Sequence, residues 1–183
     1  MLIANHSSYI DIMLMFRMSK KPFVFVGKKE LTKIPFFGYL YKRAAITVDR
    51  SSFESRKKVY KNAIPFINKG YSICVFPERE YLDETILLNP FKRGAFKIAI
   101  EHKLPILPIV FLDCKRKFPW YTTHGFPGQL RVKALDVIDT KALKTENIKQ
   151  LSDKMHEKIN KELLLDPKQS AVKAILIWER TTS

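Results

Sequence analysis

Short apolar runs alternate with segments of helical periodicity along most of this chain, and this alternation restricts the folds that it can adopt. The apolar runs predict strands at residues 3–4, 23–26, 45–48, 71–76, 106–112 and 129–135. Helices are predicted at residues 7–18, 35–43, 53–68, 94–102 and 146–164. Alternating strands and helices predict an α/β fold: a mixed, largely parallel sheet flanked by helices. In such a sheet, ligands bind beyond the carboxyl ends of the strands.

Basic residues outnumber acidic ones by a wide margin. The 183 residues include 33 Lys and Arg against 18 Asp and Glu, a formal charge of +15. Such an excess indicates an anionic partner: nucleic acid, an acidic membrane surface, an acidic carrier protein or a phosphorylated substrate. Solvated surface charge with no specific partner is the alternative. No nucleic-acid recognition motif is present, so we expect no nucleic-acid partner.

Several signals for other chemistry are absent. The chain lacks G-x-S-x-G, C-x-x-C, H-E-x-x-H and the P-loop pattern, so we expect neither a nucleophile-elbow hydrolase nor a metal or nucleotide cofactor. Cys74 and Cys114 lie in or beside apolar runs and are expected to be buried thiols in a reducing compartment. The longest apolar run, at 104–112, falls short of the ~20 residues that a membrane-spanning helix needs.

The first candidate site is the segment Asn5-His6-Ser7-Ser8-Tyr9-Ile10-Asp11. A carboxylate that accepts the proton of one imidazole nitrogen orients the ring, so the other nitrogen can deprotonate a hydroxyl. We expect His6 on a turn and Asp11 in the early turns of the following helix, because a spacing of five does not align on a regular helix. A His–Asp pair alone is more often structural. No Ser or Cys nucleophile is signalled beside it, which favours direct attack by a substrate hydroxyl.

Two further groups of polar residues follow predicted strands. Lys28 and Arg50 offer cations, and Arg50 could bind phosphate oxygens in bidentate fashion or pair with Asp49 on the surface. Glu78 follows the strand at 71–76 and could accept a bond from a substrate hydroxyl, or instead cap a helix or pair with a cation. Lys92 precedes a predicted helix whose N-terminus favours an anion.

In this order and spacing the groups resemble the 1-acylglycerol-3-phosphate acyltransferase family, within the wider glycerolipid acyltransferase superfamily. Four blocks over about residues 3–112 carry the resemblance. They are N-H-x-x-x-x-D at 5–11; K-K-E-L, I-P-F-F-G and D-R at 28–31, 34–38 and 49–50; F-P-E and F-K-x-G-A at 76–78 and 91–95; and a proline-bearing strand at 104–110, with Pro108 at the family position.

The resemblance implies transfer of an acyl chain from an acyl thioester to the sn-2 hydroxyl of lysophosphatidic acid, which forms phosphatidic acid. The donor would be carried by coenzyme A or acyl carrier protein, with no further cofactor. His6 would be the general base and Asp11 would orient it. Lys28 and Arg50 would bind the phosphate of the lysophospholipid, and Glu78 would contact its glycerol part.

The chain departs from the family pattern at two places. Arg79-Glu80-Tyr81 stands where the family reads G-T-R after F-P-E, which leaves open another lysolipid or an amino-lipid as acceptor. Five residues precede His6, where the family carries membrane-embedding helices. We therefore expect an N-terminally truncated acyltransferase domain at 1–165 and a tail at 166–183, peripheral on the anionic phospholipid of the cytoplasmic face of the inner membrane. A non-catalytic membrane-binding remnant is the alternative.

Overall fold

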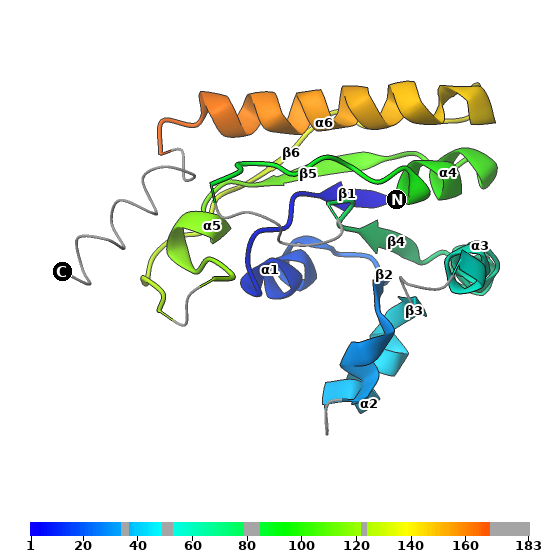
Figure 1. The fold of residues 1–183 in the computed structure, drawn as a ribbon, viewed down its shortest axis with the longest axis horizontal. Helices are drawn as coiled ribbons and strands as arrows, with labels where there is room; N and C mark the ends of the chain where they lie inside the picture. The colour runs from blue at the N-terminus through cyan, green and yellow to red at the C-terminus, as the bar shows by residue number, and fades with distance from the viewer. Residues whose placement is uncertain (34–36, 49–52, 79–84, 122–123, 169–183) are drawn as a thin grey trace. The chain divides into compact units, whose positions relative to one another are not determined.

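The computed structural model describes residues 1–33, 37–48, 53–78, 85–121 and 124–168 (Figure 1). Within these residues the strands form one sheet in the order β3-β2-β4-β1-β5-β6, mixed and largely parallel, which confirms the α/β prediction. The strands are β1 Leu2–Ala4, β2 Phe23–Lys28, β3 Ala45–Val48, β4 Ser72–Val75, β5 Leu107–Phe111 and β6 Val132–Ala134. The helices are α1 Ile10–Met18, α2 Phe37–Ala44, α3 Phe53–Asn68, α4 Gly94–Glu101, α5 Cys114–Lys117 and α6 Ile148–Leu165, with 3-10 turns η1 Lys29–Lys33 and η2 Thr145–Asn147.

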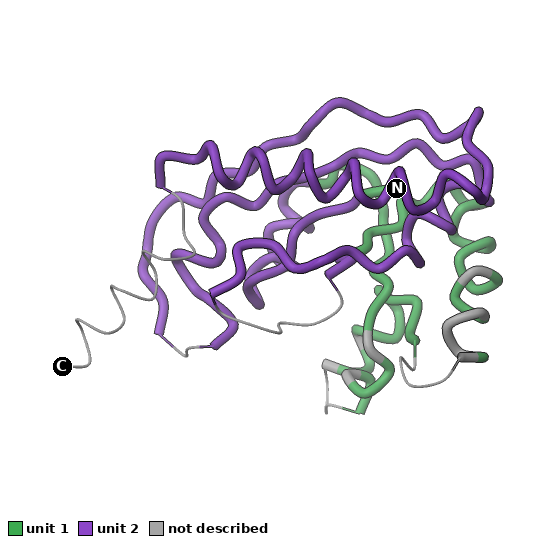
Figure 2. Tube along the Cα trace, turned by 45° about the horizontal axis from the view of Figure 1, so that its top comes forward, with its two compact units in different colours: residues 1–2, 19–75 green, residues 3–18, 76–183 purple. Residues whose placement is uncertain are grey.

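The chain divides into two compact units, coloured separately in Figure 2. The first comprises residues 1–2 and 19–75. In it β2 pairs in parallel with β3 and with β4, so that Phe25 lies opposite both Ala45 and Cys74. Helix α3 packs on β3 and β4. Strand β2 runs on through Gly27 to Lys28, although the sequence predicted its end at Gly27. Position 27 requires glycine, because a side chain there would collide with Tyr41.

The second unit comprises residues 3–18 and 76–183 and holds the candidate site. Strand β6 pairs antiparallel with β5, with Ile109 opposite Ala134. Helix α6 packs on β5 and on α4. Its apolar face is buried as the periodicity predicts, through Leu151, Met155, Ile159 and Leu163. The ends of β1 and β5 and the start of α1 all belong to this unit, which brings the first sequence block close to residues around 111–120.

The helix boundaries agree closely with the sequence predictions. The sequence predicted Ser7 or Ser8 as the cap of a helix that runs to Met18; helix α1 spans Ile10–Met18, and the Ser8 hydroxyl accepts the Ile10 N–H at 3.2 Å. Helix α3 spans Phe53–Asn68, as predicted, and includes Pro65 near its end, where a proline removes few helical bonds. Lys115 does not add to the surface charge, because it is buried and donates to the Ile86 carbonyl at 2.6 Å.

The other sequence predictions concern the two cysteines, membrane-spanning helices and the domain boundary. Cys74 and Cys114 are free, buried thiols, as predicted. None of the helices in the described ranges combines the length and the apolar character needed to cross a membrane. The boundary between a domain at 1–165 and a tail stays a prediction, and the apolar stretch at 171–178 lies outside the described residues.

Candidate active site

The first block forms a tight turn between β1 and α1, and Asp11 is at its centre. Asp11 lies in the first turn of α1 and is completely buried. Its Oδ2 accepts the backbone N–H groups of Ser7 at 2.8 Å and Ser8 at 2.9 Å. The same oxygen contacts Nδ1 of His6 at 2.9 Å. The two side chains therefore meet as the sequence predicts, with His6 on the turn and Asp11 on the helix, while their catalytic role stays a prediction.

The contact between His6 and Asp11 determines which imidazole nitrogen carries the proton. A carboxylate accepts and does not donate, so Nδ1 of His6 carries the hydrogen that lies toward Oδ2. Nε2 is then the nitrogen with a lone pair that can accept a proton. The His6 side chain is 22% exposed, whereas that of Asp11 has no exposure, so a small molecule can reach the imidazole and not the carboxylate. This is the arrangement that a base and its orienting group require.

An aromatic ring fixes the plane of the imidazole. Phe76, the residue after β4, stacks on His6 with ring centroids 4.2 Å apart and planes inclined by 15°. Stacked rings at this separation attract each other and exclude other side chains from that face. The imidazole is thus held at its edge by Asp11 and on one face by Phe76.

Glu78 binds the backbone of His6 rather than pointing into solvent. It is 4% exposed, and its Oε1 accepts the His6 N–H at 2.7 Å. Its Oε2 accepts the Asn89 N–H at 2.9 Å and the Asn89 side-chain amide at 3.4 Å. Burial raises the pKa of Glu78, although the bonds from Asn89 and His6 oppose the shift. The predicted contact with the glycerol of a substrate remains a prediction, and no sequence pattern indicated Asn89.

The segment from β5 to Trp120 holds the turn from the other side. The Asn5 side chain donates to the Phe111 carbonyl at 3.0 Å and accepts the Phe111 N–H at 2.8 Å. The Ser8 hydroxyl donates to the Phe118 carbonyl. The Trp120 N–H donates to the Ser7 carbonyl at 3.2 Å. These bonds satisfy polar groups that the turn would otherwise bury unpaired, so they make its geometry rigid.

The predicted phosphate-binding residues are described by the structure to different extents. Lys92 is exposed just before α4, and its backbone N–H donates to the Pro77 carbonyl at 2.9 Å, next to Glu78. Lys28 is the last residue of β2, in the other unit, and its side chain is not described. Arg50 and the segment 79–84 lie outside the described residues. In the parts described, no three His, Cys, Asp or Glu side chains gather where they could hold a metal ion.

The fold is that of a solved acyltransferase. The crystal structure of the 1-acyl-sn-glycerophosphate (LPA) acyltransferase PlsC from Thermotoga maritima superposes with a TM-score of 0.72 at 23% sequence identity, over 90% of this chain and 66% of that one. The model of the family named Acyltransferase matches residues 1–112, which include the His6–Asp11 turn, Glu78 and Lys92. This chain therefore belongs to the acyltransferase family, which confirms the resemblance found in the sequence.

Curated relatives agree with this assignment. The chain is 33% identical over 159 residues to the 1-acyl-sn-glycerol-3-phosphate acyltransferase of Cocos nucifera, covering 84% of this chain and 50% of that protein. It is 32% identical over 155 residues to the enzyme of the same name from Escherichia coli, covering 82% and 61%. The chain spans about half the length of the Cocos nucifera protein.

Proposed function

We propose that this chain transfers a fatty acyl group from an acyl thioester to the sn-2 hydroxyl of lysophosphatidic acid, forming phosphatidic acid and a free thiol. The observation that supports it most is the buried Asp11 carboxylate, 2.9 Å from Nδ1 of a partly exposed His6. A relative that covers most of this chain, the Escherichia coli protein, is named a 1-acyl-sn-glycerol-3-phosphate acyltransferase.

In the proposed reaction Nε2 of His6 removes the proton of the acceptor hydroxyl. The oxygen then attacks the carbonyl carbon of the thioester, a C–O bond forms, and the tetrahedral intermediate collapses as the C–S bond breaks. The departing thiolate takes the proton from the imidazolium, which restores the base. Asp11 stabilises the imidazolium between these two proton transfers. The protein forms no covalent intermediate in this sequence of steps.

Cations provide the proposed recognition of the acceptor. Lys92 is exposed before α4, and its backbone N–H donates to the carbonyl of Pro77, the residue before Glu78. A phosphate bound near Lys92 would therefore lie near the segment that holds His6. Lys28 and Arg50 are proposed as further phosphate ligands from the sequence blocks. The donor is proposed to be acyl-coenzyme A or acyl carrier protein; both are anionic and suit a chain with a formal charge of +15.

We propose an anionic phospholipid surface as the place of action, at the cytoplasmic face of the inner membrane. Helix α1, which carries Asp11, exposes large apolar side chains: Met13 is 67% exposed and Phe16 is 49% exposed. Such side chains, on a strongly basic chain, favour the interface of an acidic bilayer. Both the lysophospholipid and its product have acyl chains that reside there.

The test is an assay of thiol release by the purified protein with lysophosphatidic acid and an acyl thioester. We expect turnover in the wild type and none in His6→Ala. The matched control is His102→Ala, because His102 caps the C-terminal end of α4 and lies outside the His6–Asp11 turn. Full activity in the His6 variant would show that the proposed mechanism is wrong.

Two alternatives follow from specific features. The sequence Arg79-Glu80-Tyr81 favours a different lysolipid or an amino-lipid as the acceptor, and a panel of acceptors decides between them. A preference for a phosphate-free acceptor would remove the roles of Lys28, Arg50 and Lys92. The high positive charge is also compatible with a non-catalytic membrane-binding remnant, for which liposomes would retain the protein while no acceptor is turned over.

A further inference from the structure

Helix α5 supports the His6–Asp11 turn. The Phe118 carbonyl, at the C-terminal end of α5, accepts the Ser8 hydroxyl. Two residues further on, the Trp120 N–H donates to the Ser7 carbonyl at 3.2 Å. Both bonds act on the turn, so its position depends on where α5 lies.

The same helix carries a buried lysine. Lys115 is only 4% exposed, and its Nζ donates to the Ile86 carbonyl at 2.6 Å. An ammonium group loses hydration when it is buried, and this cost is offset only where its N–H groups find acceptors. The Ile86 carbonyl is such an acceptor, and the bond attaches the segment around residue 86 to α5.

The segment that begins at Ile86 leads to the backbone of His6. Three residues after Ile86, the Asn89 N–H donates to Oε2 of Glu78 at 2.9 Å. The other oxygen of this carboxylate, Oε1, accepts the His6 N–H at 2.7 Å. Lys115 therefore supports the Glu78 side of the site, while the C-terminal end of α5 supports the turn. All of these residues belong to the second compact unit.

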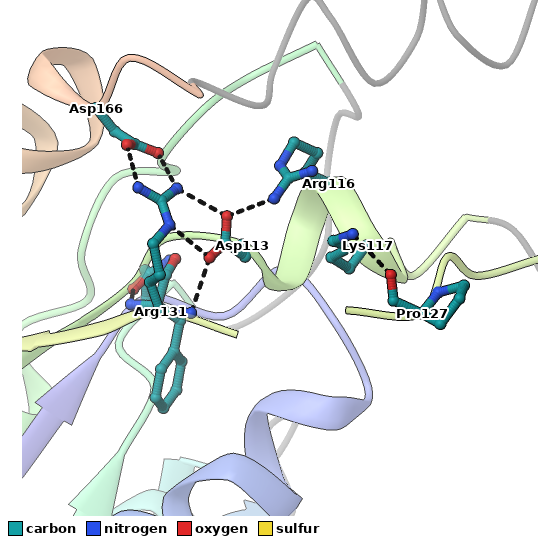
Figure 3. A network of polar contacts seen from close by, with 8 residues as sticks. Asp113, Arg116, Lys117, Pro127, Arg131 and Asp166 are labelled. Carbon is teal, nitrogen blue, oxygen red and sulfur yellow. Dashed lines mark hydrogen bonds and ion pairs between the residues drawn. The ribbon is translucent and has the colours of Figure 1, made fainter. Parts of the chain in front are cut away.

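The start of α5 is fixed by bonds that do not involve Lys115. Figure 3 shows them: Asp113, the N-cap residue of α5, accepts bonds of 2.7 to 2.8 Å from Arg116 and Arg131. Arg131 also binds Asp166, at the end of α6, at 2.7 and 2.8 Å. Removal of the buried ammonium group should thus leave α5 in place and release only the segment to which it is bonded.

We propose that Lys115 is a positioning residue: by tying the Ile86 carbonyl to α5, it keeps Glu78 where it holds the backbone of His6. The hydrogen bonds are a property of the fold, while their effect on turnover rests on the proposed acyltransferase function. Lys115 is buried, so it acts through Glu78 and not by touching a substrate.

The proposal predicts that the Lys115 ammonium group contributes to kcat and not to KM. Without it the segment at 86–89 is less restrained, and a smaller fraction of the enzyme has its base aligned. One hydrogen bond from a charged donor is lost, so we expect kcat to fall by about tenfold. Lys92, the proposed phosphate ligand, is bonded to Pro77 and not to this segment, so KM for the acceptor should stay the same.

The turnover experiment uses Lys115→Met, which keeps an apolar stem of similar length but cannot donate. The matched control is Lys117→Met, because Lys117 lies on the same helix and also donates to a carbonyl, that of Pro127 at 2.8 Å. We expect kcat to fall about tenfold in Lys115→Met and to be unchanged in Lys117→Met, with the wild-type KM in both. Wild-type kcat in Lys115→Met, or a change in KM alone, would overturn the proposal.

A double-mutant cycle separates positioning from a general loss of stability. If Lys115 acts through Glu78, its loss should cost little once Glu78→Gln has weakened the bonds of that side chain. With all variants assayed below their unfolding transitions, we expect kcat of the double variant within about twofold of Glu78→Gln alone. Losses that multiply in the double variant would show that Lys115 does not act through Glu78.

Amide hydrogen exchange tests the same connection without any activity. Because Lys115 joins the segment of Asn89 to α5, the Asn89 amide should be protected in the wild type as well as the Phe118 amide, which donates to the Cys114 carbonyl at 2.9 Å. In Lys115→Met we expect exchange about tenfold faster at Asn89 and unchanged at Phe118. A wild-type Asn89 amide much less protected than that of Phe118 overturns the proposal even if Lys115→Met does not fold. The expected exchange pattern without thiol release by the wild type would count against the proposed function alone.

Discussion

The backbone N–H of His6 donates to Oε1 of Glu78 at 2.7 Å, across 72 positions of the sequence. Glu78 therefore holds the main chain of the base, while Asp11 holds its ring edge and Phe76 covers one ring face. Both Glu78 oxygens accept hydrogen bonds from the protein, so Glu78 positions the backbone of His6 whether or not it also contacts a substrate.

The variant Glu78→Gln separates these two roles. A glutamine amide has one oxygen that accepts, so either the His6 N–H or the Asn89 N–H would face an NH₂ group. We expect kcat to fall about tenfold and the free energy of unfolding to fall by about 1–3 kcal/mol, with little change in KM. Steady-state kinetics and urea unfolding measure these quantities. Glu101→Gln, on the surface of α4, should leave all three unchanged. A rise in KM alone would assign Glu78 to the substrate instead.

The variant Asp11→Asn tests the orienting group. An asparagine oxygen can take the place of Oδ2 and accept the same three bonds, but a neutral amide does not stabilise the imidazolium that forms when His6 takes a proton. We expect kcat to fall by on the order of 10³-fold or more, measured by thiol release. Asp153→Asn, on the exposed side of α6, is the control and should behave as wild type. Activity within about tenfold of the wild type would show that Asp11 is structural.

Local sequence patterns predicted some features of the structure but not those that depend on contacts between distant parts of the chain. The periodicity of α6 and the apolar runs of β3 and β5 lie within single elements, and the His6–Asp11 pair is five residues apart, so each is visible in the sequence. The bond between Asn5 and Phe111 joins residues 106 positions apart and depends on the topology of the sheet. Helix α5 has four residues, too few for a periodic signal, so it was not predicted.

The network around Asp113 predicts how stability depends on pH. Although burial opposes it, hydrogen bonds from Arg131 and Arg116 hold the pKa of Asp113 well below its usual range. Arg131 likewise lowers the pKa of Asp166. Folding therefore favours the ionised carboxylates. Their contribution is present above the unfolded pKa of about 4 and is lost as the pH falls toward the lowered folded values.

The variant Asp113→Asn measures that contribution. At about pH 7 we expect it to lower the free energy of unfolding by about 3 kcal/mol, because two guanidinium groups lose their buried partner. As the pH falls to about 3, the wild type should approach the variant. Urea unfolding at several pH values provides both curves. If the free energies of unfolding of the wild type and Asp113→Asn differ by a constant amount over this pH range, the assigned role of the ionised Asp113 is contradicted.

Lys92 provides a test of acceptor recognition. It is exposed, so its replacement by methionine should not affect the fold, and its Coulomb attraction to a phosphate acts on binding rather than on the chemical step. We expect Lys92→Met to raise KM for lysophosphatidic acid by about tenfold at low salt with kcat retained, and we expect the difference to shrink as salt is added. Lys154→Met, on an exposed position of α6, should leave KM unchanged. A monoacylglycerol acceptor should not distinguish Lys92→Met from the wild type, because it carries no phosphate; an equal effect on both acceptors would place Lys92 away from the phosphate.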